Sequence, residues 1–166
     1  MQEPARFHSP EYQSVISDVP ASTHCSLSTA ALNTMKQAAE ATYPLEACGL
    51  LIGTLNQHGW RIEEARQVKN LNTERAADRF QLDPAAYQAI DRELRGSEQE
   101  IIGVFHSHPD CPARPSPTDL DSAWEGYLYP IISTHNGNAI DILYWTLAEH
   151  HDKRCFSPVT QMETQI

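Results

Sequence analysis

The sequence predicts an α/β fold in which helices pack against a mixed β-sheet. It contains about six short apolar runs with the character of strands and three stretches with helical spacing. Some consecutive strands are separated by tight turns and others by predicted helices, so both antiparallel and parallel neighbours are expected. With 166 residues, the chain is long enough for one domain with a hydrophobic core.

The first half of the chain is expected to contribute a strand, a helix and a hairpin. A short strand is predicted over residues 23–28, and Ser28 is suited to cap a helix over residues 29–42, where apolar side chains recur at helical spacing. Residues 47–55 are a compact apolar run typical of a buried strand. A turn ending in glycine joins this run to a partly exposed strand over residues 60–71, and we expect the two strands to pair as a hairpin.

The second half is expected to contribute two helices and three more strands. Asp83 followed by Pro84 is a typical helix start, with a capping residue before a proline at the first helical position. A turn built on Asn-Gly joins the last two strands. The predicted elements are helices over residues 85–95 and 116–124 and strands over residues 100–108, 127–134 and 139–147.

Domain boundaries are expected where the composition becomes polar. Residues 1–22 are predicted to be a flexible leader, residues 23–149 the folded domain, and residues 150–166 a frayed C-terminal tail. The leader has no apolar core typical of a signal peptide, and no stretch approaches the length of a membrane span. We therefore expect a cytoplasmic protein that does not engage a membrane.

Charge and cysteine usage exclude several classes of function. The 22 acidic and 12 basic residues give a net charge of −10, which argues against nucleic acid or an anionic membrane as the main partner. The four cysteines are widely spaced and form no Cys-X-X-Cys pair, so neither a disulfide framework nor a cysteine-rich zinc site is expected. Each cysteine, including Cys111, is expected to be a free thiol.

The stretch HSHPDCPARPSPTD, residues 106–119, carries the strongest chemical signal. Side chains alternate between the faces of a strand, which is expected to place Ile102, Val104, His106 and His108 on one face. Two imidazoles on one face can bind the same metal ion, and Asp119 can supply a third ligand after the proline-stiffened spacer. Two histidines and one carboxylate leave the fourth position of a catalytic zinc site for water.

A simpler interpretation of the same stretch stays open at this point. A lone histidine at the end of a strand is usually only a hydrogen-bonded surface group. Ser116 and Pro117, with Asp119 at the third helical position, also form a good helix start. The two interpretations are compatible, because a capped helix is a rigid way to present Asp119.

Glu46 is the candidate base, since hydrolysis at a metal site requires a group that accepts a proton from water. The stretch PLEACGLLIG places Glu46 after a proline and just before the most buried strand. It is either a solvated turn residue or an acid at the edge of the core. In the second case, burial would raise its pKa and suit it to carry a proton.

Together, the two stretches resemble the JAMM signature of the MPN-plus (JAB) zinc metalloproteases, in their small prokaryotic form. HSHP with the later serine and aspartate matches the signature, and PLEACGLLIG is similar to the segment that carries the catalytic glutamate of the family. The resemblance covers residues 28–147. It implies an αβ sandwich like that of the cytidine deaminases, with a mixed, curved sheet flanked by helices.

The resemblance also implies an activity, namely a zinc peptidase or isopeptidase that cleaves after the C-terminal Gly-Gly of ubiquitin or a ubiquitin-like protein. Carried over by position, His106, His108 and Asp119 would bind Zn²⁺. Glu46 would activate the water and then protonate the leaving amine, and Ser116 would steady the oxyanion. Ser107 is expected on the opposite strand face, with a supporting role at most.

The small members of the family resemble enzymes that serve ubiquitin-like sulfur carriers, so a sulfur-carrier-type protein ending in Gly-Gly is the expected partner. The alternatives are a deconjugating enzyme for ubiquitin-like conjugates and a non-catalytic MPN or RadC-like binding module. The filled ligand positions argue against the binding module. A zinc deaminase would need H-x-E and P-C-x-x-C motifs that are absent here, and the chain is too short for an amidohydrolase barrel.

Overall fold

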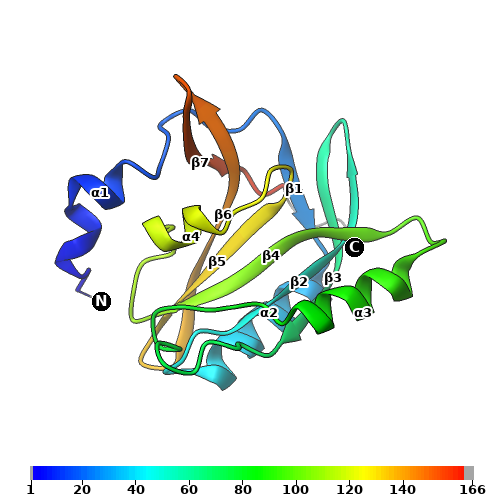
Figure 1. The fold of residues 1–166 in the computed structure, drawn as a ribbon, viewed down its shortest axis with the longest axis horizontal. Coiled ribbons are helices and arrows are strands. Elements are labelled where there is room, and N and C mark those ends of the chain that lie inside the picture. The colour runs from blue at the N-terminus through cyan, green and yellow to red at the C-terminus, as the bar shows by residue number, and fades with distance from the viewer. Residues whose placement is uncertain (1, 163–166) are drawn as a thin grey trace.

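Strands β1 to β7 form one mixed sheet in the computed structural model, which describes residues 2–162 (Figure 1). The strands are β1 (His24–Leu27), β2 (Cys48–Asn56), β3 (Gly59–Val68), β4 (Glu100–Pro109), β5 (Leu128–His135), β6 (Asn138–His150) and β7 (Lys153–Val159). Their spatial order is β1-β3-β2-β4-β5-β6-β7. The neighbours β1/β3 and β4/β5 are parallel and the other neighbours are antiparallel, so the predicted mixed sheet is confirmed.

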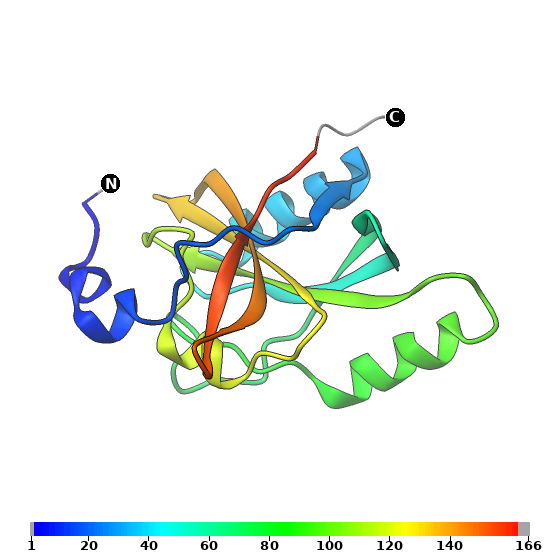
Figure 2. The same ribbon diagram turned by 90° about the horizontal axis from the view of Figure 1, so that it is seen from above.

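Helices cover both faces of this curved sheet (Figure 2). The helix α2 (Thr29–Thr42) buries Met35 and three alanines in a hydrophobic cluster on one face. The helix α3 (Pro84–Leu94) and the single-turn helix α4 (Pro117–Asp121) contribute to a second cluster on the other face, in which Ile90 is buried. The predicted αβ sandwich is therefore confirmed, and the candidate site lies on the α3/α4 face.

The helix starts follow from the capping residues. Ser28 Oγ accepts a hydrogen bond from the Ala31 amide (3.0 Å), and the Asp83 side chain accepts one from the Ala85 amide (2.9 Å). Each side chain satisfies an amide that has no partner inside the helix. The third predicted helix is shorter than expected, because it ends at Asp121 after little more than one turn.

Both predicted hairpins are present. β2 and β3 pair antiparallel across the turn that ends in Gly59, and β5 and β6 pair antiparallel across Asn136 and Gly137. Asn136 and Gly137 have positive φ angles of 50° and 85°. Asn-Gly adopts this left-handed geometry readily, which is why the pair marks hairpin turns in sequences.

The expected frayed tail over residues 150–166 is wrong for its first part. β7 pairs antiparallel with β6, and Cys155 and Phe156 are buried. The charged residues at the start of β7 and Pro158 near its end hid the strand in the sequence. Proline is tolerated there because β7 lies at the edge of the sheet. Residues 163–166 lie outside the described part of the chain.

The expected flexible leader also differs from the structure. Residues 2–22 contain a 3₁₀ helix, η1 (Ala5–His8), and a short helix, α1 (Pro10–Gln13). Phe7 and Val15 are buried, so this segment packs against the domain. Two isolated apolar residues in a polar stretch show no periodicity, and the sequence could not reveal their burial. None of the helices among residues 2–162 combines the length and apolarity needed to cross a membrane.

Candidate metal centre

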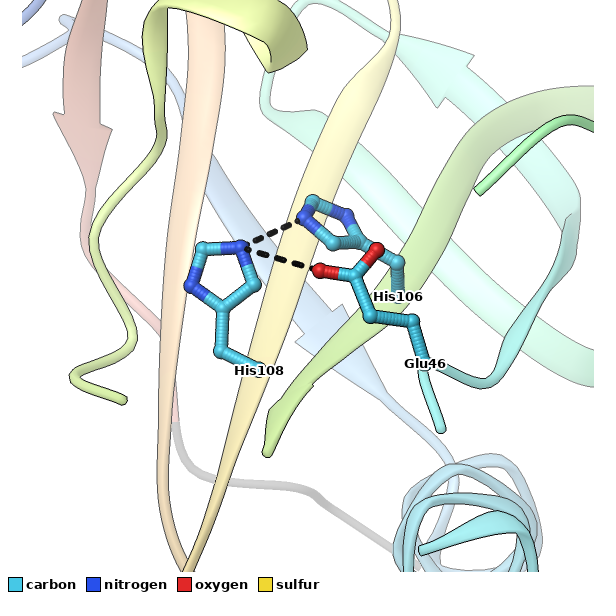
Figure 3. Close-up of side chains that lie close together, drawn as sticks. All are labelled: Glu46, His106 and His108. Atoms are coloured by element: carbon cyan, nitrogen blue, oxygen red, sulfur yellow. Dashed lines mark hydrogen bonds and ion pairs between the residues drawn. The ribbon is translucent and has the colours of Figure 1, made fainter. Parts of the chain in front are cut away.

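The register between β2 and β4 brings the two sequence motifs together. The strands are antiparallel, with Cys48 opposite His106. Counting outward along both strands, Glu46 comes opposite His108. Glu46 and His108 are about sixty residues apart in the sequence, but they lie next to each other where the two neighbouring strands meet (Figure 3).

Ser107 and Ala47 extend this register just beyond β2. The Ser107 amide donates to the Ala47 carbonyl (3.0 Å), and the Ala47 amide donates to Ser107 Oγ (2.8 Å). Ser107 is fully buried. Its hydroxyl thus holds the backbone beside Glu46, which is the supporting role expected for it.

The expected position of Ile102 is wrong. Ile102 belongs to the hydrophobic cluster beneath α2, on the face opposite the two histidines. The register between β2 and β4 shifts between Leu51 and Ile52, and this irregularity gives β4 one extra residue. A bulge of this kind breaks strict alternation. The prediction that His106 and His108 share one face is unaffected, because both follow the bulge.

Three side-chain atoms that could bind a metal ion form a compact triangle. His106 Nε2 and His108 Nε2 are 3.0 Å apart, and Asp119 Oδ2 lies 3.3 Å from each of them. Ligand atoms of a tetrahedral zinc with bonds of about 2.0–2.1 Å are separated by about 3.3 Å. The geometry and the chemistry of these two imidazoles and one carboxylate therefore fit zinc without rearrangement.

Glu46 lies beside the two histidines of this triangle (Figure 3). Glu46 Oε1 is 3.9 Å from His108 Nε2, and one ligand atom each from Glu46 and the two histidines fall within 4.8 Å of one another. Asp119 is nearer to both imidazoles, so the geometry favours Asp119 as the third ligand and leaves Glu46 adjacent to the metal position.

Burial makes the carboxyl group of Glu46 a weaker acid than an exposed glutamate. Its side chain is almost completely buried. This burial raises its pKa to about 8, although the His108 imidazole opposes the rise. Of the two interpretations drawn from the sequence, the acid at the edge of the core is confirmed. A carboxyl group that titrates near neutral pH can both accept and donate a proton.

The ionisation of the triangle is set by burial and by mutual contacts. Burial lowers the pKa of His106. Burial also lowers the pKa of His108, but contacts with Asp119 and Glu46 outweigh it and raise the value to about 9. Burial of Asp119 works against its charge, yet the two imidazoles hold its pKa well below the usual range. Asp119 is therefore an ionised carboxylate, the form that binds a metal.

Ser116 and Asp119 form a capping box at the start of α4. Ser116 Oγ accepts from the Asp119 amide (3.0 Å), and Asp119 Oδ2 accepts from the Ser116 amide (2.8 Å). A carboxylate has about four acceptor sites, so the cap orients Asp119 and leaves capacity for a metal. Because the Ser116 hydroxyl acts as an acceptor in the cap, its own hydrogen can be donated elsewhere. The capping and metal interpretations are thus both compatible with the structure.

Two supporting contacts were not visible in the sequence. His108 Nδ1 lies 2.9 Å from the Pro112 carbonyl, which fixes the ring so that Nε2 faces the triangle. The Phe80 ring stacks on His106 with centroids 4.6 Å apart. A carbonyl oxygen leaves no trace in a sequence motif, and Phe80 lies in a polar connector with no periodic pattern.

Two pockets of different character flank the triangle. A wide pocket of about 450 Å³ is bordered by His106 and Asp119. Its other walls are mainly apolar and include Phe80, Leu82, Tyr87, Trp124, Tyr129 and Phe156. A narrow pocket of about 60 Å³ is bordered by Glu46, His108 and Ser116 and has mainly polar walls.

The cysteines take no part in the triangle. Cys25, Cys48, Cys111 and Cys155 are all free thiols, as expected. Cys111 borders the narrow pocket, where its sulfur accepts a hydrogen bond from Arg6 Nη2 (3.3 Å).

Comparison with known proteins adds an independent result. Residues 28–148 match the family described as prokaryotic homologs of the JAB domain. The chain is 33% identical over 104 residues to a desampylase from Haloferax volcanii, covering 61% of this chain and 72% of the relative. It is 28% identical over 106 residues to a CysO-cysteine peptidase from Mycobacterium tuberculosis, covering 63% of this chain and 70% of the relative.

One solved structure is similar to the fold of this chain over most of the length of both proteins. The solution structure of a protein from Desulfitobacterium hafniense has a TM-score of 0.67 and 26% sequence identity, and the match covers 84% of this chain and 93% of that one. The family match includes Glu46 and the whole stretch from His106 to Asp119.

Proposed function

This chain belongs to the small prokaryotic JAB (JAMM) family, and from that premise we propose that it is a zinc-dependent peptidase acting on a ubiquitin-like protein. We place the cleavage after the C-terminal Gly-Gly of a carrier of the sulfur-carrier type. The observation that carries the proposal is the triangle of His106, His108 and Asp119 with buried Glu46 beside it. The names of the two relatives, a desampylase and a CysO-cysteine peptidase, support the substrate class.

His106, His108 and Asp119 would hold the zinc. Bound zinc supplies Lewis acidity, which makes water a stronger nucleophile near neutral pH and polarises the scissile carbonyl. The outer contacts from Pro112 and Ser116 keep His108 and Asp119 in the orientation that binding requires.

Glu46 would move the proton. It accepts a proton from water as the water oxygen bonds to the glycine carbonyl carbon, and it passes this proton to the nitrogen as the C–N bond breaks. The products are a carrier ending in a glycine carboxylate and a free amine. The Ser116 hydroxyl would donate a hydrogen bond to the oxyanion that forms during the attack.

The wide pocket would receive the carrier. It is apolar, and an extended carrier tail that enters it would bring the last glycine to the triangle. Trp124, at this pocket, has 53% of its surface exposed and contacts Tyr87 and Tyr127 edge to face. Exposed aromatic residues are frequent anchors in protein interfaces.

An isopeptidase for ubiquitin-like conjugates would use the same groups and differ only in its leaving group. A non-catalytic binding module is disfavoured, because such a module has no need for a ligand triangle with an adjacent buried acid. The two enzymatic alternatives are therefore separated by the substrate and not by the chemistry.

The test is cleavage of a ubiquitin-like protein that carries a short tail after its Gly-Gly. The zinc-loaded protein should remove the tail, as read from intact masses. Glu46→Gln should lower the rate by about 10²–10⁴-fold and still bind zinc, because it loses the proton carrier. Glu98→Gln, at an exposed loop position, is the matched control and should be active.

The possible failures have different meanings. No cleavage by the zinc-loaded wild type would contradict the proposed substrate class. Full activity of Glu46→Gln would contradict the assignment of the base and leave the peptidase proposal standing.

A further inference from the structure

The N-terminal segment, defined here as residues 3–16, forms one wall of the narrow pocket. It precedes the part of the chain that matches the JAB family, residues 28–148. Arg6, Phe7 and Tyr12 of this segment border the pocket together with the candidate catalytic groups. Figures 1 and 2 both show the two short helices of the segment beside the end of β4.

Phe7 fixes the segment against the loop that carries the metal-binding motif. Its ring is buried and lies 6.4 Å from the His108 ring. The guanidinium groups of Arg6 and Arg114 lie over the same ring, at 5.3 and 5.6 Å from its centroid. Arg6 also donates to Cys111 Sγ (3.3 Å). The segment therefore contacts His108, Cys111 and Arg114, all of which precede α4 in the sequence.

A second anchor holds the segment to β7. The Phe156 amide donates to the Val15 carbonyl (2.7 Å), and the Ser17 amide donates to the Phe156 carbonyl (2.8 Å). Val15 is itself buried. With contacts at both ends, residues 3–16 are held in a defined position over the narrow pocket.

The narrow pocket gathers positive charge in an acidic protein. Arg6, Arg75 and Arg79 border it, although the whole chain has only 12 basic residues and a net charge of −10. Asp78 pairs with Arg75. The Arg6 guanidinium lies over the Phe7 ring and donates to the Cys111 sulfur, a weak acceptor, and neither contact neutralises its charge. Guanidinium groups bind carboxylates through short, charge-assisted hydrogen bonds.

The position of Glu46 identifies the narrow pocket as the leaving-group side. If the proposed function holds, the leaving amine receives its proton from Glu46, which borders this pocket. The pocket volume is about 60 Å³. A small group can approach here, whereas a folded protein would meet the N-terminal segment.

We propose that the N-terminal segment is a specificity element that selects small leaving groups with a free carboxylate. Arg6 contacts the carboxylate of a single amino acid or a very short tail after the Gly-Gly. Phe7 keeps the wall closed against lysine side chains of folded proteins. This inference rests on the proposed peptidase function and defines its leaving group.

The experiment compares three substrates built on one ubiquitin-like carrier. The first carries a single alanine after Gly-Gly, the second carries the corresponding alaninamide, and the third is joined through an isopeptide bond to a lysine of a folded protein. The full-length, zinc-loaded chain should prefer the acid to the amide by about ten-fold or more in kcat/KM, because a hydrogen bond to a charged group is lost in the amide. It should cleave the isopeptide conjugate most slowly.

Two variants separate the roles of the segment. Arg6→Gln, at an exposed position, should reduce the preference for the acid over the amide toward one. Phe7→Ala should raise kcat/KM for the isopeptide conjugate relative to the single-alanine substrate. Arg61→Gln removes an exposed arginine that pairs with Glu63 on β3, and it is the control for a change in net charge.

The outcomes discriminate between the two proposals. An unchanged acid-to-amide ratio in Arg6→Gln, or an isopeptide conjugate cleaved by the wild type as fast as the single-alanine substrate, would overturn the role of the segment and leave the peptidase assignment intact. Failure of the wild type to cleave any of the three substrates would overturn the proposed function and this inference with it.

Discussion

The two pockets beside the candidate metal centre are bordered by different residues and have opposite characters. The wide pocket has a volume of about 450 Å³ and mainly apolar walls, which include the exposed side chain of Trp124. The narrow one, at about 60 Å³, is polar and contains Glu46 and Ser116. The difference indicates that the wide pocket serves binding and the narrow pocket serves the chemical step. One side can gain binding energy from apolar contact, and the other depends on the exact placement of a few polar groups.

The largest expected effect comes from removing the charge of Asp119, which borders the wide pocket and faces both histidines. Asp119→Asn keeps a side-chain oxygen for the helix cap but removes the charge that faces His106 and His108. We expect zinc affinity to fall by more than about 100-fold, beyond the 10–100-fold effect of an outer contact, and cleavage to be lost with it. Metal content after dialysis against a weak chelator measures the loss.

The same measurement tests which carboxylate is the ligand. Glu46 and Asp119 both lie near His108, at 3.9 and 3.3 Å. If Asp119→Asn retained zinc and Glu46→Gln lost it, the assignments of ligand and base would have to be exchanged.

A smaller effect is expected from the narrow pocket alone. Ser116→Ala should lower kcat by about 10²–10³-fold if the hydroxyl donates to the oxyanion. The loss of the cap should also cost about 1 kcal/mol of stability. Ser28→Ala is the matched control, because Ser28 caps α2 with the same geometry (3.0 Å to the Ala31 amide) far from the motif in sequence.

Turnover and melting temperature together decide the role of Ser116. A lowered melting temperature in both variants with a loss of turnover only in Ser116→Ala supports the oxyanion role. Normal turnover in Ser116→Ala would show that the residue is only a helix cap.

The smallest effect is expected from the wide pocket. Trp124→Ala should raise KM for the carrier about ten-fold with little change in kcat, because part of an apolar contact worth about 1–2 kcal/mol is lost. Leu55→Ala, an exposed apolar residue at the end of β2, is the control. A fall in kcat without a change in KM would contradict the division between binding and chemistry.

Features that depend on neighbouring residues could be predicted from the sequence. The caps at Ser28, Asp83 and Ser116, the two hairpins and the histidine pair on β4 all follow from local spacing. The structure places the predicted site residues together, and the match to the family covers them. Their roles in catalysis stay predictions until the variants are measured.

Features that depend on distant contacts could not be predicted. The bulge that moves Ile102 to the other face arises from a register shift against Leu51 and Ile52 on a different strand. The burial of Phe7 depends on a surface built by Arg114 and His108, about one hundred residues away in the sequence. Both pockets are formed by several elements at once, so no single stretch encodes either of them.

The antiparallel register of β2 and β4 also has a consequence for how this protein can change. The pairing of Cys48 with His106 sets the register that brings Glu46 opposite His108, and the Glu46 amide also donates to the Ala76 carbonyl between the two strands (2.6 Å). Most of residues 69–99 lie outside the sheet, and part of this excursion lines the wide pocket. The strand register does not depend on the length of this excursion. The excursion can therefore vary to recognise another carrier, provided that the contacts of Ala76 with Glu46 and of Phe80 with His106 are kept.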